Sequence, residues 1–183
     1  MVRAGLAVAM LSCGAAQAAE RIPLAAWAAR LPSHFVVHGV KTEPTYEEVI
    51  DISRDGDVFS AMGGAPGWAE RLTESVEVGA TGEVSRRPCA RGADCREARP
   101  PSGFLATAAL VAAARRGALA GTGGVEAFGP WRVICVDAVK LGYAQPILDP
   151  CFDIRTGAAI AEKHRRNGRF EGPTLDPSSI RFD

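Results

Sequence analysis

Several arginines surround two closely spaced cysteines in the middle of the chain, and this segment offers the most specific chemistry in the sequence. These arginines and cysteines are Arg86, Arg87, Arg91, Arg96, Arg99, Cys89 and Cys95. A guanidinium group binds a carboxylate through two parallel hydrogen bonds, so an arginine-rich loop suits an acidic partner. We therefore expect Arg87, Arg91 and Arg96 to bind a protein or another anionic ligand. The alternative is a loop that only increases solubility, because acidic residues are interspersed among the arginines.

A second candidate binding residue is Trp68, which follows the glycine-rich stretch at residues 63–67. A tryptophan exposed on a loop is a common anchor at protein interfaces. The same side chain could instead be buried against a sheet, and the sequence leaves both alternatives open.

The cysteine count predicts two disulfides. Four cysteines remain once an export signal is removed, and an even number in an exported domain favours pairing. Of the three possible pairings, the most local one joins Cys89 to Cys95 and Cys135 to Cys151. The first bond would close a short polar loop, and the second would join two strands. A zinc site is the alternative, but these spacings differ from the short knuckles of zinc ligands. We expect no metal and no cofactor.

The histidines do not form a recognisable catalytic motif. His34 and His38 share a face of a predicted strand but stand about 13 Å apart, too far to hold one metal ion. His164 lies in a charged segment, and the chain lacks the G-x-S-x-G pattern of a nucleophile elbow. The sequence therefore favours a non-catalytic binding or accessory protein of the bacterial cell envelope, of an inhibitor-like kind. The alternative is a small secreted hydrolase, which a cleft holding His34 or His38 beside a carboxylate and a serine would favour.

The overall charge argues against nucleic acid as a partner. The chain has 183 residues with 21 basic and 21 acidic side chains, whereas nucleic-acid binding depends on a positive surface. No apolar run reaches the roughly 18–20 residues of a membrane-spanning helix. The proportions of 47% hydrophobic and 23% charged residues are those of a globular chain.

The first 19 residues have the order of a secretory signal peptide. Arg3 provides the positive charge, residues 5–12 form the apolar segment, and residues 16–18 have the small-residue pattern at which a leader peptidase cleaves. Cys13 allows an alternative, a lipid anchor, although the residues before it depart from the usual lipobox. Either route predicts a periplasmic or secreted protein.

Alternating hydrophobicity and turn signals predict the elements that position these residues. Strands are expected at residues 34–41, 45–54, 57–61, 71–78, 131–141 and 147–155, with a type I′ turn at Asp55 and Gly56. Helices are expected at residues 23–31, with Trp27 in the core, and at residues 102–119, where alanine dominates. Residues 79–101 are expected to form a long surface loop, and residues 121–124 a flexible connector.

Together these elements predict an α+β fold for residues 20–183, taken as a single domain after a signal peptide at residues 1–19. We expect a mainly antiparallel sheet of five to seven strands, one long alanine-rich helix, a short N-terminal helix and two disulfides. Segregated strands and helices favour this class over alternating α/β.

Overall fold

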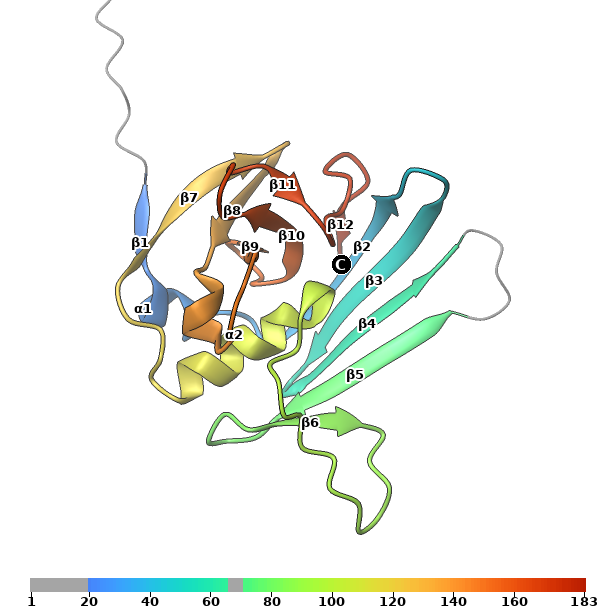
Figure 1. Cartoon of the computed structure of the whole chain (residues 1–183), viewed down its shortest axis with the longest axis vertical. Coiled ribbons are helices and arrows are strands. Elements are labelled where there is room, and N and C mark those ends of the chain that lie inside the picture. Colours follow the sequence, from blue (N-terminus) through green and yellow to red (C-terminus); the bar gives the residue numbers. More distant parts are fainter. Residues whose placement is uncertain (1–19, 66–70) are drawn as a thin grey trace, which may run out of the picture.

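Twelve strands form two antiparallel sheets in the computed structural model, which describes residues 20–65 and 71–183 (Figure 1). The strands are β1 (Arg21–Pro23), β2 (His34–Thr42), β3 (Glu47–Asp55), β4 (Val58–Gly64), β5 (Leu72–Val78), β6 (Val84–Arg87), β7 (Thr122–Phe128), β8 (Trp131–Cys135), β9 (Leu148–Asp153), β10 (Ala159–His164), β11 (Phe170–Glu171) and β12 (Arg181–Phe182). The helices are α1 (Leu24–Ala28), the short 3-10 helix η1 (Gly103–Leu105), α2 (Ala106–Arg115) and the 3-10 helix η2 (Ala138–Leu141). One sheet has the order β1-β7-β8-β9-β10-β11 and the other β12-β2-β3-β4-β5-β6.

The predicted α+β class is wrong, because the described chain is mostly antiparallel sheet. Only about 14% of it is helical, and η1 with α2 forms one helical segment of 13 residues. The helix expected at residues 102–119 therefore exists but is shorter, and there are two sheets where one was expected. The prediction of two disulfides is confirmed: they join Cys89 to Cys95 and Cys135 to Cys151.

Helix α2 lies between the two sheets, with strands β8–β10 on one side and β4–β6 on the other (Figure 1). Leu110 packs in the cluster that contains strands β8 and β9, whereas Val111 packs in the cluster that contains β4, β5 and β6. Every residue from Ala106 to Ala113 is buried. Because alanine side chains are small, both sheets can approach the helix closely, which explains why this segment is alanine-rich.

Beyond the end of the helix the two sheets pack directly on each other. Val37 of β2 and Ile52 of β3 share one buried cluster with Val133 of β8 and Ile160 of β10. This cluster leaves the alternate residues of β2 and β3 on the opposite face of their sheet.

The turn between β3 and β4 lies one residue later than expected. Asp55 pairs with Val58, so the two loop residues are Gly56 and Asp57. Gly56 has a φ of 60°, and Gly alone has a positive φ in this loop. The turn therefore has the II′ geometry, with glycine first, and not the I′ geometry that requires two positive φ angles.

The segment expected as a flexible connector, residues 121–124, instead begins strand β7. A Cβ atom on Gly123 would lie 2.7 Å from the side chain of Ile134 and 3.0 Å from that of Leu24. Glycine is required here because β7 passes close to its neighbours, and not because the chain needs freedom.

Strand β8 ends at Cys135, earlier than the expected limit of residue 141. Helix η2 follows it, and the side chain of Asp137 accepts a hydrogen bond from the N–H of Val139 at 3.0 Å. Cys135 lies directly opposite Cys151 of β9, with a Cα–Cα distance of 4.0 Å, and Cys151 is fully buried. This disulfide is therefore part of the core.

The short N-terminal helix is present as α1, and Trp27 is buried in the core as expected. Its indole N–H donates to the carbonyl of Ile154 at 2.8 Å, which satisfies its one polar group. Within the described residues, none of the helices has the length and apolar character that crossing a membrane requires. The predicted signal peptide, Cys13 and Trp68 lie outside the described residues.

Candidate functional site

The arginine-rich segment is a β-hairpin, which we call the disulfide hairpin (residues 84–97). It begins as strand β6, which pairs with β5, and its second arm pairs back onto β6. The N–H of Arg86 donates to the carbonyl of Cys95, and the N–H of Glu97 donates to that of Val84, each at 2.8 Å. The long loop expected at residues 79–101 is thus structured, because backbone pairing extends the sheet through it.

The tip of the disulfide hairpin is a tight turn closed by the Cys89–Cys95 bond, whose Cα atoms lie 5.8 Å apart. The N–H of Ala93 donates to the carbonyl of Ala90 at 3.0 Å, and Gly92 has a φ of 83°. Arg91 therefore occupies the first central position of this turn. It carries the one long side chain between the two cysteines, and Asp94 is the other charged residue there. In Figure 1 the hairpin projects beyond β6, away from the rest of the molecule.

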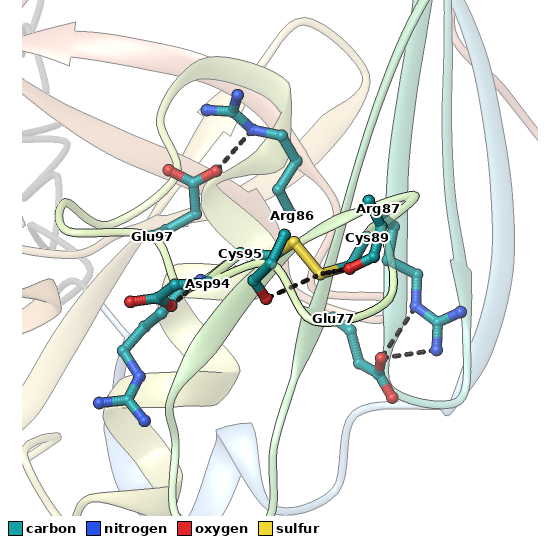
Figure 2. The surroundings of a disulfide bond; sticks show 10 residues. Glu77, Arg86, Arg87, Cys89, Asp94, Cys95 and Glu97 are labelled. Atoms are coloured by element: carbon teal, nitrogen blue, oxygen red, sulfur yellow. Dashed lines mark hydrogen bonds and ion pairs between the residues drawn. A yellow bond between two sulfur atoms is a disulfide. The ribbon is translucent and has the colours of Figure 1, made fainter.

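Two of the arginines form ion pairs on opposite sides of the hairpin (Figure 2). Arg87 donates through Nε and Nη2 to the carboxylate of Glu77 at 2.8 and 2.6 Å. Arg86 donates through Nε to the carboxylate of Glu97 at 2.9 Å. Because adjacent strand residues point to opposite faces, each of these two guanidinium groups has a carboxylate partner of its own. Arg87, a predicted binding residue, is already engaged.

Arg91 and Arg96 differ from Arg87, since within the described chain neither forms an ion pair with a carboxylate inside 4 Å. Both are exposed. Arg96 lies opposite Ser85, and its N–H is capped by the side chain of Asp94 at 3.1 Å. The pKa of Glu83 is lowered, first by the hydrogen bond from the hydroxyl of Thr81 and last by the charge of Arg96. Of the three arginines predicted to bind, Arg91 and Arg96 are therefore the ones available to a partner.

A groove of about 480 Å³ runs beside the base of the disulfide hairpin. Its walls include Arg86, Arg87 and Arg99, with Glu74, Glu97 and Pro100. Strand β6 pairs with β5 only from Ser75 to Val78, so the first residues of β5 border this groove with an unpaired edge among the described strands. Arg99 was grouped with the other arginines in the sequence, but nothing in the sequence pattern indicated that β5 would form the opposite wall.

His38 lies on the face of β2 that points away from the core, and both of its ring nitrogens contact carboxylates. Nδ1 lies 2.7 Å from Asp51 and Nε2 lies 3.1 Å from Asp183. The hydrogen bond with Asp51 raises the pKa of His38, burial opposes this, and Asp183 adds to the rise. Since both nitrogens are occupied, this imidazole is not placed to take a proton from a serine.

The carboxylate of Asp51 also accepts a hydrogen bond from Arg71 at 2.6 Å. Burial acts to raise the pKa of Asp51, but the bonds from His38 and Arg71 outweigh it and lower that pKa. His34 pairs only with Asp55, at 2.9 Å, and is largely exposed. Among residues 20–65 and 71–183, no group of three or more His, Cys, Asp or Glu side chains is arranged to hold a metal ion.

The architecture described so far is that of a disulfide-linked, mostly antiparallel β protein with two sheets around one helix. Comparison of the chain with protein-family models, with curated proteins and with solved structures gives no match.

Proposed function

We propose that the protein is an exported, non-catalytic binding protein of the bacterial cell envelope, and that the disulfide hairpin binds an acidic partner. The observation that carries this proposal is the projecting turn with Arg91 at its tip, closed by a disulfide and free of ion pairing within the described residues. A closed loop loses less conformational freedom when a partner binds it, so its binding is stronger than that of an open loop.

The composition of the tip supports a binding role over a purely solubilising one. The residues beside Arg91 are Ala90, Gly92 and Ala93, which let a partner surface approach the backbone closely. A surface that served solubility alone would not need Arg91 to be held in place by both a disulfide and a turn hydrogen bond. The expected contact is the guanidinium fork of Arg91 on a partner carboxylate, with Arg96 as a second contact.

The arrangement of the histidines supports binding rather than hydrolysis. A hydrolase of the kind weighed above needs a histidine with one free nitrogen beside a serine, in a cleft. His38 has both nitrogens on carboxylates, and His34 is exposed beside Asp55. Neither residue lines the groove at the base of the hairpin.

Export is the part of the proposal that concerns location. Two disulfides are compatible with an oxidising extracellular or periplasmic compartment, because the cytosol keeps thiols reduced. The order of charge, apolar segment and small residues at positions 1–19 adds to this argument.

The binding proposal is tested by capture from an envelope extract with the mature protein and two double variants. We expect Arg91→Ala with Arg96→Ala to lose the specific partner, and high salt to release that partner from the wild type. The matched control is Arg166→Ala with Arg169→Ala, which removes two exposed arginines from a different turn and should retain the partner. If both double variants capture the same proteins as the wild type, the disulfide hairpin is not the binding element.

A further inference from the structure

A small cavity lies between the segment around η2 and strands β9 and β10, on a part of the molecule that the hairpin proposal does not use. Its volume is about 280 Å³, and its walls include Tyr143, Gln145, Ile147, Leu148, Pro150 and Glu162. Ligand sites for drug-sized molecules begin at about 300 Å³, so this cavity suits a group of a few heavy atoms.

Glu162 is the only charged residue that lines this cavity. Its side chain is partly buried, and within the described chain no Lys, Arg or His lies within 4 Å of its carboxylate. Burial raises the pKa of Glu162, and a hydrogen bond from the backbone of Gly103 opposes that rise. Lys163, the next residue, pairs with Glu126 on the other face of the strand at 2.5 Å. The cavity thus holds a negative charge that the protein itself leaves without a counter-ion.

The rest of the cavity is largely apolar, with a few neutral polar side chains, namely Ser102, Tyr143 and Gln145. Leu148 and Pro150 form part of the wall, while Gln145 and Tyr143 contribute oxygen atoms. The hydroxyl of Tyr143 donates its proton to the carbonyl of Pro101, so its oxygen is left as an acceptor. Ile147 at the mouth is 68% exposed, an unusual value for a large apolar side chain.

A second exposed apolar residue lies on η2, outside the lining of the cavity. Val139 on η2 is 55% exposed, next to Ala138, which lines the cavity. Of the four large apolar side chains that are exposed in the described chain, Ile147 is the one that lines this cavity. An apolar wall beside a single, partly buried carboxylate matches a ligand that is cationic at one end and hydrocarbon at the other.

We infer that this cavity binds a small alkylammonium group, with the ammonium on the carboxylate of Glu162 and the alkyl chain against Leu148, Pro150 and Ile147. An ammonium has three donors, which the Glu162 carboxylate and the oxygens of Gln145 and Tyr143 can accept. A cation also removes the cost of a partly buried charge without a partner.

The test is a titration of the ¹⁵N-labelled mature protein with n-butylammonium, followed by amide chemical shifts. We expect saturable shifts at Gly103, Gln145 and Ile147, with a dissociation constant in the low millimolar range, as a ligand of about five heavy atoms allows. The neutral probe 1-butanol has the same chain length but no charge, and should bind at least about tenfold more weakly.

Three variants separate the charge from the fold. Glu162→Gln should weaken n-butylammonium at least about tenfold while leaving 1-butanol unchanged. The matched control is Glu171→Gln, because Glu171 lies opposite Glu162 in the β10–β11 pair but is exposed and does not line the cavity. The affinity of the Glu171→Gln variant for n-butylammonium should equal that of the wild type. Ile147→Ser keeps the charge and should weaken both probes by about threefold through loss of part of the apolar wall.

Each other result overturns the inference. No saturable shift up to about 50 mM n-butylammonium, well beyond the affinity expected for so small a ligand, would exclude the site. Equal affinity for the alcohol and the ammonium, or equal losses in Glu162→Gln and Glu171→Gln, would show that Glu162 does not recognise the charge. None of these results bears on the disulfide hairpin, so the two proposals can fail separately.

Discussion

The two disulfides of this protein have the same chemistry in opposite surroundings. Cys135 and Cys151 join β8 to β9 at the centre of the molecule, where Cys151 is fully buried. Cys89 and Cys95 close the disulfide hairpin, where all residues from 88 to 94 are exposed. The first bond lies within packed side chains on both sides, and the second is supported by backbone hydrogen bonds alone.

Loop length does not explain the different roles of these bonds. The separations of 6 and 16 residues imply about 2 and 3 kcal/mol of loop-entropy stabilisation in the simple model. The difference lies in the folded state without the bond. Without the Cys135–Cys151 bond, packing would still order β8 and β9, so the folded state would gain no conformational entropy. Without its disulfide the hairpin tip would become mobile in the folded state. The conformational entropy that the folded tip gains would offset most of the stabilisation lost by removing the bond.

The largest expected effect comes from the core bond. Cys135→Ala with Cys151→Ala should lower stability by about 3 kcal/mol, which corresponds to about 6–12 °C in melting temperature for a chain of this size. Thermal unfolding followed by circular dichroism measures it. A loss of no more than about 2 °C would mean that the β8–β9 pair also loosens when the bond is removed, and the contrast between the two disulfides would disappear.

The next effect tests the same contrast with side-chain volume. Ala113→Leu adds three carbon atoms to a fully buried position of α2, where helix and sheets are in contact. Overpacking of this kind costs about 1–3 kcal/mol. The same substitution at Ala90, on the exposed turn, should cost nothing measurable. Urea unfolding of both variants provides the comparison, and similar midpoints would show that α2 is not tightly packed between the sheets.

The sequence predicted the parts of the molecule that depend on local pattern. Trp27 in the core, strand β2 and the two disulfides follow from periodicity and from the cysteine count. The second sheet was missed because β7 contains Gly123 and Gly124 near its start, which look like a connector, although Gly123 serves close packing. Long-range proximity produces such requirements, and a single sequence does not display them.

The candidate site was predicted in part for the same reason. Clustered charge indicated Arg87, Arg91 and Arg96, but only the fold shows that Glu77 on β5 engages Arg87. Glu162 carries no local signal at all, since its surroundings come from segments that begin at residue 101 and end near residue 150. Trp68 lies outside the described residues and stays a prediction.

A smaller effect distinguishes the charges of the body from those of the hairpin. The pKa of His38 is raised by Asp51 and Asp183, so the stabilisation it provides is complete below its ordinary pKa of 6.5 and is lost as pH rises through the raised value. The melting temperature of the wild type should exceed that of His38→Gln by more at about pH 5.5 than at about pH 8.5, by about 1–3 °C because the pair is partly exposed. Arg91→Ala, the matched change in the hairpin, should show no such pH dependence. Parallel curves of melting temperature against pH for wild type and His38→Gln would contradict the stabilising role of protonated His38.

The smallest effect on stability is expected where the effect on binding is greatest. Cys89→Ala with Cys95→Ala should change the melting temperature by less than about 2 °C. Removing the bond increases the conformational entropy of the unfolded chain and of the folded hairpin tip, and these two gains nearly cancel. Hydrogen exchange should nevertheless become faster at the N–H groups of Ala93 and Arg86, which donate within the disulfide hairpin. Affinity for the acidic partner should fall, since Arg91 is no longer held in place before binding. A melting loss equal to that of the core double variant, with unaltered affinity, would contradict the recognition role of the hairpin. In that case the Cys89–Cys95 bond would be a second structural link, and the arginines beside it would serve only to solubilise the surface.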